Sequence, residues 1–559
     1  MTTPTSETTD LGALRDAVAE LHTTVAQVTE QRDSYKKAYE LAMLELERLR
    51  RNLFGKKAEK VDPAQIALVF EPIRRMLEEE AAKAAAAAAA DVDAQTTNEG
   101  GGSDPGPKGR PHGKRNLATL EHAPIEEIRL VPPDLPVDAV ELEGETSWRL
   151  EWKKAGWVRL RIVRPRFVVP AAPEQQAETG AETTVVIAEP PDEMIPRGIA
   201  GPAMLAHVLV SKFGDHIPFH RQEEILARQG VDLDRGTMCR WLDRCHELAS
   251  SVVDAMADEA RETAAVIATD ATGILVQAKE QCRRGHFWVC IADEAHVFFR
   301  YTPRHTSDGP MTFFAGFTGY VQADASNVYD ALFRRDKAPT EVACLAHARR
   351  KFFESIRSDK DRALTGVGFI NELFAIDRSF KDAPPASRLA IRRSRAGPVV
   401  DAMRRWKDAE LARPDLERRS PIARALGYLD RHWAALTRFL DDGRLRLSNN
   451  WSELELRRVV VGRKNWLFVG SDEGAEAACT FVSLIASCSL HRLDPEAYLR
   501  DLFRVLPAWP RSRVLELSPR YWARTRARLD AAQLAKPLGP IAIPLPPPSE
   551  EPAENEHAG

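Results

Sequence analysis

The amino-acid sequence predicts a multidomain protein of the mixed α+β and α/β class. Its 559 residues suffice for about three to five structural units, at the usual size of roughly 100–200 residues per domain. Apolar residues recur every 3.5 positions near the N-terminus, every second position within residues 126–189, and with helical spacing from about residue 195. Short strand patterns then alternate with helical patterns between residues 259 and 490. We therefore expect an N-terminal helix, a small β unit, a helical region and a larger α/β domain.

Composition restricts the class of protein. Hydrophobic residues make up 44% and charged residues 29%, which is typical of soluble proteins with a sizeable core. The seven cysteines contain no Cys-x-x-Cys pair and none precedes Cys239, which excludes a disulfide-rich secreted protein and a cysteine zinc finger. No apolar run approaches the ~18 residues of a membrane span, and the first ten residues lack the pattern of a signal peptide. We expect a soluble cytoplasmic protein without a membrane partner.

Charge is distributed unevenly along the chain. The 78 Lys and Arg residues nearly balance the 82 Asp and Glu residues, so the formal net charge is -4. Residues 1–100 carry 13 basic and 18 acidic side chains, whereas residues 345–440 carry 21 basic and 12 acidic ones. The two segments therefore differ by 14 charges, from -5 to +9. A nearly neutral average does not exclude binding to a polyanion.

Residues 10–57 are predicted to form a coiled coil. Apolar side chains recur in alternating steps of four and three over about six heptads, a repeat that winds helices into a left-handed supercoil. This pattern favours self-association through the helix, and the alternative is a single amphipathic helix packed on its own protein. The seam consists of Leu14, Val18, Leu21, Val25, Val28, Arg32, Tyr35, Tyr39, Ala42, Leu46, Leu49 and Leu53.

Three further segments precede the larger domain. Residues 58–118 are alanine-rich and then glycine-rich, which predicts a linker; its basic pair Lys114 and Arg115 suits either a minor-groove arm or a solvated linker. Residues 119–190 are expected to form a small antiparallel β unit. Within residues 191–258, a short helix, a turn at Gly230 and a second helix capped by Asp234 fit a helix-turn-helix, although such pairs also occur in structural bundles.

Residues 259–490 are predicted to form the larger α/β domain. Strand patterns occur at residues 264–269, 286–292, 296–301, 319–323 and 340–345, with a helix between the last two strands. Three hairpin strands followed by a strand, a helix and a strand is the order of a ribonuclease-H-like sheet. Asp270 directly follows the first strand and Asp324 the fourth, so adjacent central strands would place them side by side. A single aspartate at a strand end is more often a cap, but two close carboxylates stay ionised when they share a cation such as Mg²⁺.

A third carboxylate and several cations complete this predicted site. Glu453 lies about one turn into a helix that begins at Ser448 or Asn449, where its side chain can reach the sheet edge. Arg463 and Lys464 follow on the same segment, as a polyanionic substrate would require.

Three short motifs are distinctive. Residues 449–471 contain Asn-Asn-x-x-Glu, followed by Arg and by Gly-Arg-Lys-Asn-Trp-Leu-Phe. Residues 319–324 read Gly-Tyr-x-Gln-x-Asp, and residues 344–352 read Cys-x-x-His-x-Arg-Arg-Lys-Phe. With these motifs the chain resembles the insertion-sequence-66-type transposases, a family of DDE enzymes with a ribonuclease-H-like fold. The similarity extends from about residue 14 to residue 503 and includes the helical entry at residues 212–223.

The resemblance implies a function and a set of site residues. It assigns Asp270, Asp324 and Glu453 as catalytic acids that bind two Mg²⁺ or Mn²⁺ ions, which cleave transposon ends and direct the freed 3′-OH to target DNA. The implied partners are double-stranded transposon ends and target DNA, a second copy of the chain and accessory proteins of the same element, at the bacterial nucleoid. Expected DNA contacts are His347, Arg349, Arg350, Arg457, Arg463, Lys464, Lys114 and Arg115.

Two departures from the family pattern leave alternatives open. The family usually has Asp-Glu-Thr-Pro at the first acid, whereas this chain has Asp-Ala-Thr-Gly at residues 270–273. The family's cysteine zinc motif has no counterpart within residues 120–175, so no zinc is expected. The alternatives are a catalytically inactive DNA-binding derivative and a metal nuclease of the same fold that does not join strands.

The last predicted units are a helical insertion and the C-terminal segments. Asp324 and Glu453 are 453 − 324 = 129 positions apart, and the surplus at residues 355–440 is helical and arginine-rich. This insertion suits DNA contact, and a solvated scaffold is the alternative. Residues 491–540 are expected to be helical and residues 541–559 to be a disordered tail.

Overall fold

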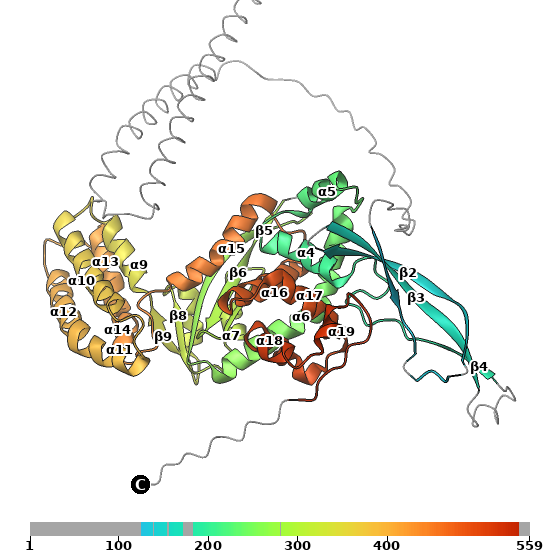
Figure 1. Ribbon diagram of the computed structural model, residues 1–559. Coiled ribbons are helices and arrows are strands. Elements are labelled where there is room, and N and C mark those ends of the chain that lie inside the picture. The colour runs from blue at the N-terminus through green and yellow to red at the C-terminus, as the bar shows by residue number, and fades with distance from the viewer. Residues whose placement is uncertain are drawn as a thin grey trace, which may run out of the picture. The chain divides into compact units, whose positions relative to one another are not determined.

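The computed structural model describes residues 124–546, apart from residues 133, 138, 154–155, 171–182 and 280. The predicted coiled coil at residues 10–57, the linker at residues 58–118 with Lys114 and Arg115, and residues 547–559 of the predicted tail lie outside the described residues. The described part combines helices with two mixed β-sheets (Figure 1).

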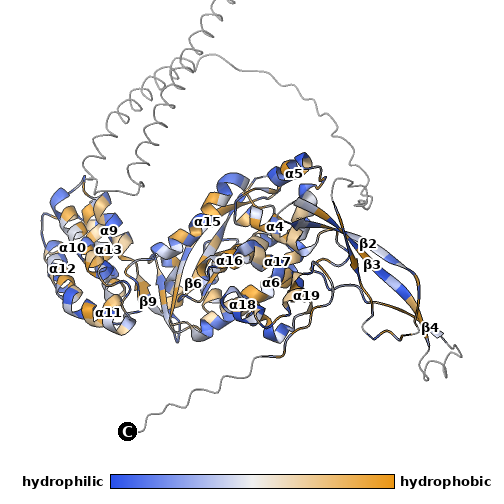
Figure 2. Ribbon diagram, viewed as in Figure 1, coloured by the Kyte–Doolittle hydropathy of each residue, from blue (hydrophilic) through white to orange (hydrophobic). Residues whose placement is uncertain are grey.

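The first sheet is built on a long hairpin. Its strands alternate hydrophilic and hydrophobic residues, as the period of two predicted (Figure 2). The prediction of a wholly antiparallel unit was wrong, because β1 pairs in parallel with β3. β3 lies between β1 and β2, and it is β2 that pairs antiparallel with β3. The strands are β1 (Ile125–Arg129), β2 (Val140–Lys153), β3 (Gly156–Pro170) and β4 (Thr183–Ile187).

A helical layer follows the first sheet. Its helices are α4 (Pro202–Phe213), α5 (Phe219–Arg228) and α6 (Arg235–Thr263). The predicted turn and cap are present: Gly230 has a φ of 77°, and the Asp234 carboxylate accepts a hydrogen bond of 2.9 Å from the Thr237 N–H. At 29 residues, α6 is about 43 Å long and its inner face packs on helix α16 (Asp472–Leu490). The α5–α6 pair is therefore joined to the main core.

The second sheet has five strands in the order β7-β6-β5-β8-β9. β5 pairs antiparallel with β6 and parallel with β8, which is the strand order that the sequence pattern predicts. The prediction that the first strand ends at Asp270 was wrong, since β6 continues to pair with β5 as far as Val276 and so keeps the backbone extended. The strands are β5 (Val266–Val276), β6 (Arg283–Ala292), β7 (His296–Thr302), β8 (Tyr320–Ala323) and β9 (Thr340–Ala343).

Helices enclose this sheet and protect its edge. On α16, the Ser483 hydroxyl accepts from the Phe299 N–H at 2.7 Å, and the Ser487 hydroxyl accepts from the Val297 N–H at 3.0 Å. These bonds satisfy backbone groups of the edge strand β7 that would otherwise be exposed to pairing with another chain. The remaining helices of the domain are α7 (Asp308–Phe313), α8 (Asp330–Arg334), α9 (Leu345–Glu354) and α15 (Asn450–Trp466).

A helical subdomain connects β9 and α9 to α15. It lies beside β9 (Figure 1) and has its own hydrophobic core, which includes Phe352, Met403 and Leu426. Its helices are α10 (Lys360–Arg378), α11 (Pro385–Ile391), α12 (Gly397–Leu411), α13 (Pro421–Arg431) and α14 (Trp433–Thr437), with a π-helical turn at Arg392–Ala396.

The C-terminal region packs against α4, α6 and α16. It contains α17 (Pro495–Val505), α18 (Pro519–Arg526) and α19 (Ala531–Ala535). The buried Arg504 guanidinium donates to the Lys536 and Gln533 carbonyls at 2.9 and 3.3 Å, which holds the last described segment against α17. Among the described helices, none combines the length and apolarity needed to cross a membrane.

Candidate active site

The first two predicted acids lie on, or directly after, neighbouring central strands of the second sheet, beyond the point where these strands are last paired. β5 and β8 run in parallel and are last paired at Ala268 and Gln322. Asp270 lies two residues beyond this pair on β5, and Asp324 directly follows the end of β8. The Asp324 carboxylate accepts from the Ser326 N–H at 3.0 Å, which begins the turn after the strand.

The third predicted acid, Glu453, lies in the first turn of α15, which packs against β5. Its Oε1 atom is 3.5 Å from Nε2 of His347, and 43% of the glutamate side chain is exposed. His347 lies in the first turn of α9, directly after β9. The carboxylate on α15 and the imidazole on α9 therefore face one another.

The charges of Asp324 and Glu453 both act on the carboxyl group of Asp270. The pKa of Asp270 is raised to about 7, mainly by burial and also by the negative charges of Asp324 and Glu453, while the hydrogen bond from the Ala271 N–H opposes the shift. The charged form of the carboxyl group is thus disfavoured, because its charge is desolvated and repelled. A cation bound among the three carboxylates would favour the ionised form.

The donor set suits a hard cation. No group of three or more His, Cys, Asp and Glu side chains is arranged to hold a metal ion in the part of the chain that the structure describes. Mg²⁺ does not require such a cage, since it prefers oxygen ligands and commonly uses one or two carboxylates together with water and substrate phosphates. The carboxylates of Asp270, Asp324 and Glu453 therefore fit Mg²⁺ or Mn²⁺ by their chemistry.

The N-terminus of α15 is tied to two other elements by Asn449, which is 1% exposed. Asn449 occupies the N-cap position, but its side chain accepts no hydrogen bond from the helix backbone. Its amide Nδ2 instead donates to the Thr269 carbonyl at 2.8 Å, and its Oδ1 accepts from the Ser452 hydroxyl at 2.8 Å. Its backbone N–H donates to Cys344 Sγ at 3.2 Å. Sequence reasoning identified only a possible cap here.

The helical subdomain also contacts the site. The Tyr428 hydroxyl on α13 donates to the Asp324 carbonyl at 3.3 Å. The buried Gln322 amide on β8 donates to the Arg446 carbonyl at 2.6 Å, in the segment that returns from the subdomain to α15. These bonds were not predicted, because they join residues more than 100 positions apart.

The predicted DNA contacts differ in their surroundings. Arg463 is engaged within the domain, since its guanidinium donates to the Thr272 hydroxyl at 3.0 Å and to the Gly273 carbonyl. It thereby joins the end of α15 to β5. Arg457 and Lys464 lie exposed on α15.

Arg349 and Arg350 lie exposed on α9, on the same helix as His347. Arg349 donates to Asn371 Oδ1 at 3.1 Å, and Arg350 forms an ion pair of 2.9 Å with Glu354. Exposed pairs of this kind contribute about 0–1 kcal/mol, so they do not prevent contact with a phosphate.

Part of the subdomain's positive charge is used internally. Arg392, which is 1% exposed, pairs with Asp377, and the buried Lys407 pairs with Asp430 at 2.6 Å. These cations stabilise the helical scaffold rather than present charge to solvent. Arginines on the exposed surface include Arg393, Arg395, Arg404, Arg405, Arg418 and Arg419.

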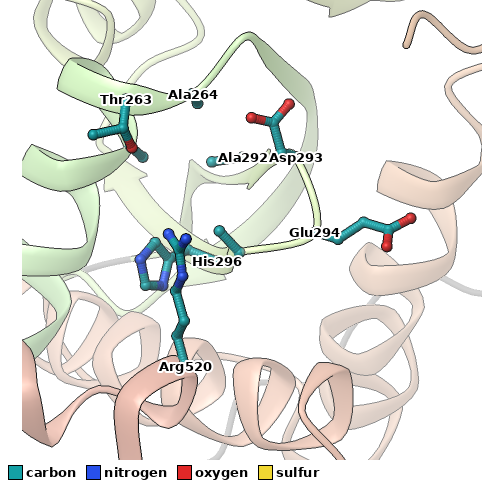
Figure 3. Close-up of a pocket in the computed structure, with 9 residues that line it drawn as sticks. Thr263, Ala264, Ala292, Asp293, Glu294, His296 and Arg520 are labelled. Carbon is teal, nitrogen blue, oxygen red and sulfur yellow. The ribbon is translucent and has the colours of Figure 1, made fainter. Parts of the chain in front are cut away.

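A cavity of about 370 Å³ lies near the opposite end of β5 (Figure 3). It is lined by residues that precede β5, by the β6–β7 turn and by Arg520, which extends from α18 toward His296. The Asp293 carboxylate in this turn accepts from the Ala265 and Val266 N–H groups at 2.9 and 3.0 Å. None of the predicted site residues lines this cavity.

Family comparisons agree with this architecture. The Transposase IS66 family matches residues 197–477, the IS66 C-terminal element matches residues 483–519, and the model described as Transposase C of IS166 homeodomain matches residues 42–140. These matches define a nucleic-acid-processing protein of the transposase class. The chain belongs to the Transposase IS66 family. The homeodomain match precedes the helix-turn-helix predicted within residues 191–258 and lies mostly outside the described residues.

Two similar proteins come from Sinorhizobium fredii strain NBRC 101917 / NGR234. The uncharacterized protein y4hP is 33% identical over 363 residues, which cover 60% of this chain and 65% of that protein. The uncharacterized protein y4jD is 30% identical over 418 residues, which cover 71% of this chain and 79% of that protein.

Proposed function

We propose that the chain is a DNA transposase that cleaves transposon ends and transfers the resulting 3′-OH strand to target DNA. The observation that carries this proposal is the placement of Asp270 on β5 and of Asp324 directly after β8, which pairs with β5 in parallel, with Glu453 on α15, which packs against β5. Family membership and the strand order of a ribonuclease-H-like sheet support it.

In this proposal Asp270, Asp324 and Glu453 hold Mg²⁺ or Mn²⁺. When bound, the metal supplies charge stabilisation for an in-line displacement at phosphorus and activates the attacking oxygen. The three acids would hold this ion at the sheet edge, where the reacting phosphate would complete its oxygen ligands. His347, at 3.5 Å from Glu453, orients that carboxylate and lies near the scissile phosphate.

The cations of the site are assigned by their exposure. Arg349, Arg350, Arg457 and Lys464 contact DNA phosphates, because they lie exposed on the two helices that carry His347 and Glu453. Arg463 instead anchors α15 to β5 and acts on DNA only through that position. Two further parts of the proposal rest on the sequence alone. Lys114 and Arg115 contact DNA, and the chain self-associates through residues 10–57.

The Asp-Ala-Thr-Gly departure does not argue for an inactive derivative. Ala271 pairs with Trp288 and Thr272 with Phe287, so the strand stays extended through the position where the family's glutamate stands. Asp270 therefore keeps its place on β5. This favours an active enzyme, and the strand-joining assay below separates a transposase from a nuclease.

The test uses the full-length protein, duplexes carrying the element's own ends, and Mg²⁺ or Mn²⁺. We expect wild-type protein to nick the ends and join a pre-cut 3′-OH end to target DNA. Asp270→Asn, Asp324→Asn and Glu453→Gln should each reduce both steps by about 1,000-fold or more, because each removes a charge that holds the metal.

Glu294→Gln is the matched control, since this glutamate is 80% exposed at the other end of the sheet. It should retain wild-type rates. Cleavage that survives in the Asp270, Asp324 and Glu453 variants contradicts the assignment, and cleavage by the wild type without joining identifies a nuclease.

A further inference from the structure

Asn449 bonds to three elements that each carry a proposed site residue. Its partner Thr269 immediately precedes Asp270 on β5, and its partner Ser452 immediately precedes Glu453 on α15. Its third partner, Cys344, is the N-cap residue of α9, which carries His347 three positions later.

The bond to Thr269 replaces a missing partner in the sheet. β8 is last paired with β5 at Ala268 and Gln322 and then leaves the sheet. The Thr269 carbonyl lies one residue beyond this point, where a buried backbone acceptor requires another donor. The Asn449 amide supplies that donor and thereby joins the start of α15 to the strand at the residue before Asp270.

These contacts differ from those of an ordinary helix cap. A capping asparagine accepts a hydrogen bond from a backbone N–H of the first turn. Here Oδ1 accepts from the Ser452 hydroxyl, and Nδ2 is directed at another element. The amide is therefore used to set the position of α15 against β5, in addition to beginning the helix.

We propose that Asn449 is a positioning residue, which fixes Glu453 and His347 relative to Asp270 so that the acids bind metal at the spacing that cleavage needs. This inference rests on the function proposed above. Displacing a reacting group by about 1 Å can cost on the order of 100-fold in rate, so a side chain that joins three site elements has a large effect without touching substrate.

The test compares Asn449→Ala with Asn450→Ala in the full-length protein. Asn450 is the matched control, because it is the same residue type one position further on and is exposed. Three quantities are measured: the rate of end cleavage, Mn²⁺ binding by electron paramagnetic resonance without DNA, and the thermal midpoint. Affinity for end DNA serves as a check on the DNA-contacting surfaces.

For Asn449→Ala we expect cleavage to fall by about 100-fold and Mn²⁺ affinity to fall at least several-fold, with DNA affinity within a factor of about two of wild type. Raising the Mn²⁺ concentration should restore part of the rate. Asn450→Ala should match wild type in all three quantities.

Ser452→Ala keeps the Thr269 and Cys344 bonds, so it provides a milder variant if Asn449→Ala is too unstable to purify. It should lower Mn²⁺ affinity less than Asn449→Ala and in the same direction. A lower thermal midpoint with unchanged Mn²⁺ affinity in the folded protein would indicate a merely structural role and overturn the inference.

Wild-type rates and Mn²⁺ affinity in Asn449→Ala would also overturn the inference while leaving the proposed function intact. A wild-type protein that neither cleaves nor takes up Mn²⁺ at the acids contradicts the proposed function and this inference together.

Discussion

Two aspartates, one within β5 and one in the turn beside its start, lie in different electrostatic surroundings. Asp293, in the turn beside the start of the strand, accepts hydrogen bonds from the Ala265 and Val266 N–H groups. Asp270, within β5, has a pKa raised to about 7, chiefly by burial and also by the charges of Asp324 and Glu453, while the hydrogen bond that it accepts from the Ala271 N–H opposes the shift. One carboxylate stabilises the fold, and the other is held at a cost in stability, as a functional group often is.

Positive backbone φ angles occur beside both aspartates. Asp293 has a φ of 47°, which aspartate tolerates better than most residues. Ala325, directly after Asp324, has a φ of 58°. A third positive φ, of 60°, occurs at Leu467, which follows the C-terminal end of α15. Leu467 forms a γ-turn, since the Phe468 N–H donates to the Trp466 carbonyl at 2.7 Å.

The largest expected effect is that replacing Asp270 and replacing Asp293 change the free energy of unfolding in opposite directions. Asp270→Asn should raise the free energy of unfolding by about 1–2 kcal/mol at pH 8 without divalent metal, because it removes a buried and repelled charge while abolishing cleavage. Asp293→Ala should lower it by about 2 kcal/mol, because two backbone N–H groups lose their acceptor. Urea unfolding with end-cleavage assays measures both, and changes of equal sign would remove the contrast.

Glu151 provides a third case for comparison. Its pKa is also raised to about 7, but no neighbouring acid contributes to the shift. Burial raises this pKa, and the Trp152 and Met204 N–H groups, which donate to the carboxylate, oppose the shift. A folded-state pKa above the unfolded value of 4.5 means that the folded protein binds the proton more tightly. The contribution to stability is therefore complete below about pH 4.5 and is lost as pH rises through about 7.

The difference between wild type and Glu151→Gln isolates this effect. The wild type should lose on the order of 2 kcal/mol relative to the variant between pH 4.5 and 8. Chemical unfolding at several pH values measures it, with end cleavage unchanged in the variant at pH 8. A difference that is constant with pH contradicts the assignment. Reduced cleavage would indicate that Glu151 contributes to cleavage, as is proposed for Asp270, rather than to the fold alone.

The smallest expected effect concerns the strained turn. Leu467 is 64% exposed, so Leu467→Gly removes little buried surface while it relieves the unfavourable φ. The free energy of unfolding should rise by about 1 kcal/mol, as measured by thermal or urea unfolding. Leu467→Ala, which keeps the strained conformation, is the control and should give no gain; equal stabilisation by both variants would show that strain is not the cause.

Much of the fold and the candidate acids followed from local patterns. Alternation within residues 126–189 and the five strand patterns after residue 259 indicated the two sheets, because period two reports which face of a strand is buried. The extent of β5 did not follow, since β6, rather than any residue within β5, keeps the strand extended past Asp270. The parallel pairing of β1 depends in the same way on a distant partner.

The hydrogen-bond partners of side chains were the feature of the structure that could least be predicted from the sequence. Asn449 bonds to residues 105 and 180 positions away, and Arg463 bonds to Thr272 191 positions away. The exposed and the buried cations of the helical subdomain have the same residue types and similar local sequence, so Arg392 could not be distinguished from Arg393 by pattern.

By itself, the sequence determined the order of elements and the family resemblance and singled out three acids as candidates, because these depend on periodicity and short motifs. Tertiary structure alone decided that Asp270 is desolvated beside two other carboxylates, that Asn449 joins three elements and that Arg463 faces inward. The physical reason is that periodicity specifies which face of an element is buried, whereas hydrogen-bond partners and local dielectric depend on the register of segments far apart in the chain.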